Sequence, residues 1–257
     1  MSEKNLIVFI NTLSINVESC IDMEFNNQIS WRNFLKQQLN FEVLSINIPG
    51  VFDNNFNYDW DFLKSYLSNK IDETGFDNLY FIGFSSSFPI LHLLAQQVYK
   101  SKVKCVIGLN PAWIRPTKND GIASRVGKDE NGSGLIFKSS LERRLQSDLL
   151  EDKTVVFDFI KKCYNIEKLE YWRMPTTVYS SIFKELKTYK NNYLRLNYVL
   201  MTSLLDEDVD QDISKKIIED LNCKHNITFS SVPHFFIWSK NRFKVFKEVN
   251  KFLLIFS

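Results

Sequence analysis

The sequence lacks the cysteine spacing that would indicate a metal site or a disulfide framework. Its four cysteines, Cys20, Cys105, Cys163 and Cys223, are widely separated and form no C-x-x-C pair, so neither a zinc site nor a set of disulfide bonds is expected. Cys105 lies inside an apolar run, where a cysteine usually serves as a small buried hydrophobic residue. We therefore expect a reducing, cytoplasmic setting.

Long hydrophobic runs and a strong charge of one sign are also missing. No apolar run approaches the ~20 residues that span a bilayer, and Leu6–Ile10 is too short for the apolar region of a signal peptide. The formal net charge of +2 gives no reason to expect a nucleic-acid partner. With 257 residues, 44% of them hydrophobic and 24% charged, the chain fits a soluble protein of one large α/β domain or two small ones.

Apolar runs alternate with helical patterns along the first 111 residues. The continuous apolar runs are typical of strands that are buried on both faces, so we expect a parallel sheet covered by helices on both sides. The expected strands are Leu6–Ile10, Phe41–Ile48, Leu79–Ile82 and Val103–Leu109, and the expected helices are Ile29–Leu39 (with Ser30 as its cap), Trp60–Ile71 and the segment after Ser87.

Residues 112–193 interrupt this alternation. A polar loop at Lys118–Gly134 is followed by helix-like segments, with no evident strand, which favours a helical cap over a small independent domain. We predict a core made of residues 1–111 and 194–257, with the cap inserted between them. The helix-like segments are Phe137–Leu150, Thr154–Tyr164 and Tyr171–Tyr189, and the core resumes with strand Leu196–Thr202, helix Asp212–Leu221, strand Ile227–Ser230 and helix Asn241–Phe256.

The segment Asp77–Val98 is the centre of the prediction. Its apolar run ends at Gly83-Phe84-Ser85-Ser86-Ser87, and a helical pattern follows. This strand–turn–helix order is the setting of the G-x-S-x-G nucleophile elbow, with Gly83 at the first small position and Ser87 in place of the second glycine. Ser85 would then lie at the apex of the turn. The alternative is that Ser85 or Ser86 only caps the helix.

A serine nucleophile needs a base, and the base needs an orienting group. Of the three histidines, His92 falls within the helix after the turn and His225 in a polar turn before the last strand, whereas His234 follows that strand directly. Asp206 follows the preceding strand, with Asp208 and Asp210 as alternatives. Ser85, Asp206 and His234 occur in the Ser…Asp…His order that goes with this elbow, so we predict that they form a catalytic triad.

The oxyanion that forms during acyl transfer needs two N–H donors. One is expected from the backbone of Ser86, directly after the nucleophile. The second is expected from the loop after the first strand, at Leu13 or the neighbouring Thr12, although this loop lacks the glycines often found there.

Nearly the whole chain resembles the α/β-hydrolase superfamily. The resemblance implies a mostly parallel central sheet with helices on both faces, an inserted helical cap, and acyl-serine chemistry that uses no metal or cofactor. The departures are Ser87 in place of glycine and Asn11-Thr12 where His-Gly is frequent. The matching segments are Leu6–Ile10, Ile48-Pro49-Gly50, Gly83–Ser87, Asp206 and His234.

A closer similarity points to one family within this superfamily. Leu109–Trp113, Asn119–Ile122 and the stretch Phe137–Cys163 are similar to the pimeloyl-carrier-protein methyl ester esterases of biotin synthesis. This similarity implies a methyl ester on an acyl chain bound to an acidic acyl carrier protein, which Arg143 and Arg144 would attract. The alternative for these arginines is a solvated helix face. The alternatives are a thioesterase that unloads a carrier protein in secondary metabolism, and a binding protein that kept the fold without turnover.

Overall fold

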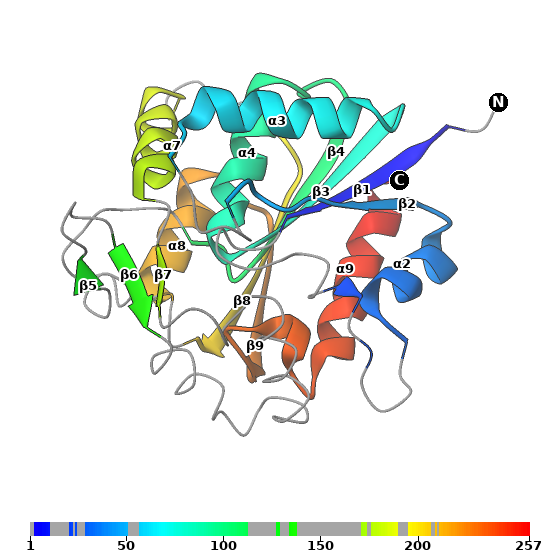
Figure 1. The fold of residues 1–257 in the computed structure, drawn as a ribbon. Helices are drawn as coiled ribbons and strands as arrows, with labels where there is room; N and C mark the ends of the chain where they lie inside the picture. The colour runs from blue at the N-terminus through cyan, green and yellow to red at the C-terminus, as the bar shows by residue number, and fades with distance from the viewer. Residues whose placement is uncertain are drawn as a thin grey trace.

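A single parallel sheet forms the centre of the molecule (Figure 1). The computed structural model describes residues 3–10, 21–22, 24, 29–50, 57–112, 127–128, 134–137, 171–173, 176–189, 195–206, 209 and 211–257. Within them six strands pair in the order β2-β1-β3-β4-β8-β9, and every pair is parallel, as the apolar runs predict. The strands are β1 (Asn5–Ile10), β2 (Glu42–Ser45), β3 (Asn78–Phe84), β4 (Val103–Leu109), β8 (Tyr198–Leu205) and β9 (His225–Pro233).

Helices cover both faces of the sheet (Figure 1). On one face lie α2 (Trp31–Leu39) and α9 (Arg242–Ile255), and on the other lie α3 (Trp60–Asp72), α4 (Phe88–Gln97) and α8 (Gln211–Asp220). As expected, Ser30 caps α2: its hydroxyl accepts the Asn33 N–H at 3.3 Å. No helix among the described residues is long and apolar enough to cross a membrane.

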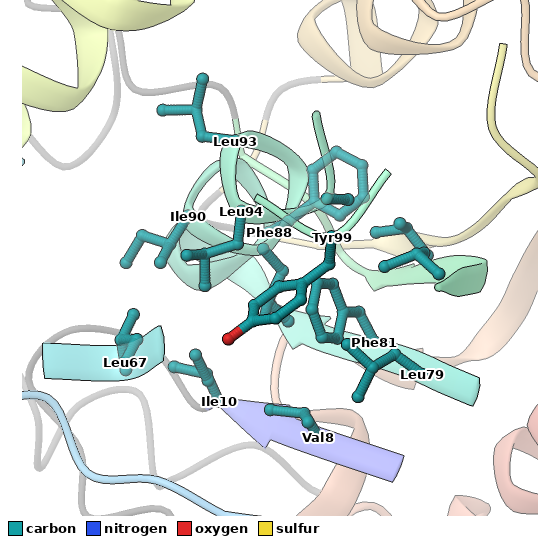
Figure 2. Close-up of a cluster of buried hydrophobic side chains, with 14 of the residues drawn as sticks. Val8, Ile10, Leu67, Leu79, Phe81, Phe88, Ile90, Leu93, Leu94 and Tyr99 are labelled. Carbon is teal, nitrogen blue, oxygen red and sulfur yellow. The ribbon is translucent and has the colours of Figure 1, made fainter. Parts of the chain in front are cut away.

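The side chains of β1 alternate between the two hydrophobic cores. Ile7 and Phe9 point towards α2 and α9, where the rings of Trp31 and Phe246 stack with centroids 4.7 Å apart. The other three apolar residues of the strand join the opposite core. Figure 2 shows that core between the strands and α4, with Val8 and Ile10 from β1, Leu79 and Phe81 from β3, and Phe88, Ile90, Leu93 and Leu94 from α4. Both faces of the sheet are therefore buried, as expected for a parallel sheet.

The described part of residues 112–193 departs from the predicted polar loop followed by helices. Three short strands, β5 (Gly127–Lys128), β6 (Gly134–Phe137) and β7 (Tyr171–Arg173), form a small antiparallel sheet. The expectation of no strand in this segment, and of helices that begin at Phe137 and Tyr171, is therefore wrong. The rest of the predicted helix Phe137–Leu150 lies outside the described residues. Each strand is too short to show the alternation of apolar and polar residues that marks a strand. In addition, Phe137 pairs with Tyr171, a residue far along the sequence, and no local pattern reveals such a pairing.

Helix α7 (Thr176–Tyr189) does follow within the segment predicted to be helical. It packs against α3 and α4. Gln97 of α4 bridges the three helices: its amide oxygen accepts the Trp60 indole N–H at 3.0 Å, and its amide nitrogen donates to Glu185 at 3.2 Å. The helix-like segment Thr154–Tyr164 lies outside the described residues, and the division into core and cap stays a prediction.

Candidate active site

Ser85 lies in a sharp turn between β3 and α4. The turn is a single 3-10 turn at Ser85–Ser87, and α4 begins directly after it at Phe88. Ser85 has a φ of 51°, a left-handed conformation that residues other than glycine rarely adopt. Its side chain lies in a buried setting, with the residue only 3% exposed. A strained serine at the end of a parallel strand is the local geometry of a nucleophile elbow.

The two small positions of this elbow are filled in different ways. At Gly83 an added Cβ would lie 2.8 Å from the Phe88 Cα, so a side chain there would collide with the backbone of α4. At the second position the Ser87 hydroxyl accepts the Phe84 N–H at 2.8 Å and lies 2.7 Å from the Ile10 carbonyl oxygen. Serine in place of glycine therefore bonds the turn to the end of β1.

Asp206 and His234 form a buried pair at the same edge of the sheet. The His234 Nδ1 lies 2.9 Å from Asp206 Oδ1 and 2.8 Å from Oδ2. The His234 side chain is 8% exposed and the Asp206 side chain is 2% exposed. The Val209 N–H also donates to Asp206 Oδ1 at 2.9 Å. Strand β8 extends to Leu205, beyond the predicted end at Thr202, so Asp206 follows the strand directly. Asp208 and Asp210 lie outside the described residues.

Ring contacts link this pair to the elbow. The ring of Phe84, the residue before Ser85, lies with its centroid 5.1 Å from that of His234. The Phe235 ring contacts both, at 5.9 Å from Phe84 and 5.2 Å from His234. Since β3, β8 and β9 are parallel strands of one sheet, the structure brings Ser85, Asp206 and His234 to its carboxyl edge, as their places after the strands predict.

No known family profile matches the sequence, and no curated protein matches it. Solved structures do match. A methylesterase from Arabidopsis has a TM-score of 0.69 at 14% identity, covering 97% of this chain and 99% of its own. A monoacylglycerol lipase from Paleococcus ferrophilus has a TM-score of 0.70 at 16% identity, covering 98% and 95%. Tomato methylketone synthase I has a TM-score of 0.68 at 9% identity, covering 100% of both chains. The chain has the α/β-hydrolase fold.

The other two histidines of this α/β-hydrolase fold lie apart from the Asp206–His234 pair. His92 is fully buried on α4, where burial lowers its pKa to about 3, and its Nδ1 lies 2.9 Å from the Tyr198 hydroxyl. His225 is the first residue of β9, half-buried against the rings of Phe252 and Phe256. The polar turn predicted for His225 is therefore wrong, because the strand begins earlier than its apolar residues indicate.

The expected oxyanion donor Ser86 has a partner that the sequence did not indicate. The Tyr179 hydroxyl, on α7, donates to the Ser86 hydroxyl at 3.1 Å. Burial raises the pKa of Tyr179 to about 12, so the phenol keeps its proton at neutral pH. No motif marks Tyr179, because the contact joins residues far apart in the chain.

The remaining predicted site residues lie outside the described residues. They are the second oxyanion donor, Leu13 or Thr12, and the two arginines predicted to bind a partner, Arg143 and Arg144.

Proposed function

We propose that this protein is a serine ester hydrolase with Ser85 as nucleophile, His234 as base and Asp206 as the orienting acid. The observation that carries the proposal is the buried His234–Asp206 pair, at 2.8 Å, beside the strained Ser85 turn. An imidazole held through Nδ1 by a carboxylate presents its Nε2 as a proton acceptor, which is what a serine hydroxyl needs to become nucleophilic.

The reaction follows from these roles. Ser85 Oγ attacks the ester carbonyl carbon, and its proton passes to His234 Nε2. The negative charge on the carbonyl oxygen is stabilised by the Ser86 backbone N–H, as in other oxyanion holes. His234 then protonates the leaving alkoxide as the C–O bond breaks, and an acyl-serine remains. Water, deprotonated by His234, attacks the acyl carbon and releases the acid and the free Ser85 hydroxyl.

The names of the similar structures favour an ester over a thioester as the substrate. Two of them are named as a methylesterase and a lipase, whereas the third is named as a methylketone synthase, so the fold alone does not fix the reaction. Within ester hydrolysis, the finer proposal is a methyl ester on an acyl chain carried by an acyl carrier protein. This substrate rests on the sequence similarity of Leu109–Trp113 and of the stretch Phe137–Cys163.

A hydrolysis assay tests the proposal. Wild-type protein is expected to hydrolyse p-nitrophenyl butyrate and to hydrolyse the matched butyryl thioester more slowly. Ser85→Ala and His234→Gln should abolish turnover, and Ser65→Ala, at an exposed serine on α3, should leave it unchanged. A folded wild-type protein that hydrolyses neither substrate would contradict the proposal and favour a non-catalytic binding protein.

The carrier-protein substrate has its own test. Complementary charge mainly raises the association rate, so replacing Arg143 and Arg144 by Ala should lower kcat/KM on an acyl-carrier-protein methyl ester at low salt. The same double variant should keep its kcat/KM on p-nitrophenyl butyrate. Equal activity of the variant and the wild type on both esters would remove these arginines from the account.

A further inference from the structure

We infer that Asn110 is a positioning residue that holds the segment carrying His234 in place relative to Ser85. Asn110 itself takes no part in the proposed chemical steps. The inference deepens the proposed function and rests on it for the role of His234. Asn110 directly follows β4, the central strand between β3 and β8, which contributes no predicted triad residue of its own.

Hydrogen bonds from this short segment reach all three strands that lead to the site. The Asn110 side-chain amide donates to the His234 carbonyl oxygen at 2.8 Å and lies 3.4 Å from that of Pro233. Its backbone N–H donates to the Met201 carbonyl on β8 at 2.7 Å, and the Ala112 N–H donates to the Ser85 carbonyl at 3.2 Å. The segment 110–112 is thus hydrogen-bonded to the elbow, to the strand before Asp206 and to the backbone of His234.

The residue type at this position meets two requirements at once. Asn110 has a φ of 44° and is 1% exposed, so its left-handed conformation is buried. Glycine would accept this conformation but would leave the two carbonyl oxygens without the amide donor. Aspartate would tolerate it too, but would place an acceptor oxygen against those carbonyls. Asparagine supplies both the conformation and the donor.

The consequence concerns the imidazole of His234. Its ring is held by Asp206, and its main chain is held by Asn110. If the main-chain bond is lost, the ring can still bond Asp206 from a displaced backbone, with its Nε2 no longer aimed at Ser85. A shift of about 1 Å of this kind typically lowers turnover about 100-fold. Binding of a small ester should change little, because the amide points at backbone oxygens.

The test compares Asn110→Gly with a matched control, Asn222→Gly. Asn222 is also left-handed, with a φ of 47°, but it is exposed and precedes β9 at the other end of the strand. Two quantities are measured: kcat and KM on p-nitrophenyl butyrate, and the proton NMR resonance of His234 Nδ1–H in the ligand-free protein. Asn110→Gly should lower kcat about 100-fold with KM within about twofold, and should shift or broaden the resonance. Asn222→Gly should match the wild type in both.

A second variant, Asn110→Asp, has nearly the same shape but no amide donor, and should behave as Asn110→Gly does. A folded variant of either kind with wild-type kcat and an unchanged resonance overturns the inference. Failure of both variants to fold overturns it too, because Asn110 would then be a residue of fold stability. If the wild type hydrolyses no ester, the proposed function fails, and the His234 resonance still decides whether Asn110 holds this segment.

Discussion

The Ser87 hydroxyl lies 2.7 Å from the Ile10 carbonyl oxygen, so the turn that carries Ser85 is bonded to the last residue of β1. Ser87 has a φ of −82°, an ordinary conformation that gives glycine no advantage at this position. The serine is therefore a replacement for the usual glycine that adds a bond without adding backbone strain.

Removing this hydroxyl should cost stability. Ser87→Ala leaves the buried Phe84 N–H without its side-chain acceptor, which typically costs about 1–3 kcal/mol. Ser87→Gly should cost about 0.5–1 kcal/mol more, because glycine loses more backbone entropy on folding. Urea unfolding of the two variants and the wild type measures both differences. A Ser87→Gly protein more stable than the wild type would show that the glycine is preferred here after all.

Asp206→Asn should lower kcat by about 10⁴-fold while leaving the fold intact, since an amide no longer holds His234 in the reactive tautomer. Asp212→Asn, at an exposed carboxylate that pairs with Lys215 across one turn of α8, serves as the control and should keep full activity. Steady-state kinetics on p-nitrophenyl butyrate measure the effect. Loss of activity in Asp208→Asn, with Asp206→Asn near wild type, would instead assign the acid to Asp208.

Tyr179→Phe should lower kcat while changing the free energy of unfolding only slightly. Helix α7 still packs through the fully buried Val178 and Ile182, so only one hydrogen bond of about 0.5–1.5 kcal/mol is lost. The Ser86 side chain, however, loses the donor that fixes it beside the expected oxyanion site. Kinetics and thermal melting of Tyr179→Phe are compared with those of Tyr66→Phe, on α3. A kcat equal to that of the wild type would show that the contact serves packing alone.

The buried His92 predicts how stability depends on pH. Its pKa is about 3 in the folded protein and 6.5 in an unfolded reference, so the unfolded chain binds the extra proton between these values. The contribution of neutral His92 to the free energy of unfolding is fully present above pH 6.5. It falls by up to about 1.4 kcal/mol per pH unit towards pH 3. Urea unfolding at pH 7 and pH 4.5 should show a shallower loss for His92→Gln than for the wild type. Equal losses of stability in the variant and the wild type would contradict this, because they would mean that His92 is also protonated in the folded protein at pH 4.5.

Much of this architecture could be predicted because parallel strands end at one edge. Ser85, Asp206 and His234 each follow a strand, and this shared position predicts their meeting without any tertiary information. The end of β8 was harder to place, because the polar pair Thr202-Ser203 interrupts the apolar run before Leu204 and Leu205.

Other contacts between distant residues could not be predicted. Tyr179 meets Ser86 across 93 positions, and Asn110 meets His234 across 124. No local periodicity encodes such pairs, because their partners are set by how α7 and β4 pack in the finished fold. The pairing of Phe137 with Tyr171 in the small antiparallel sheet is a third case.

Covalent labelling of the nucleophile identifies the reactive serine directly. The protein is treated with a fluorophosphonate probe, digested, and analysed by mass spectrometry to locate the modified residue. We predict one adduct on Ser85 in the wild type, none in Ser85→Ala, and greatly slowed labelling in His234→Gln, where the base is lost. An adduct that survives in Ser85→Ala, or a folded wild-type protein that the probe does not label, would contradict this prediction.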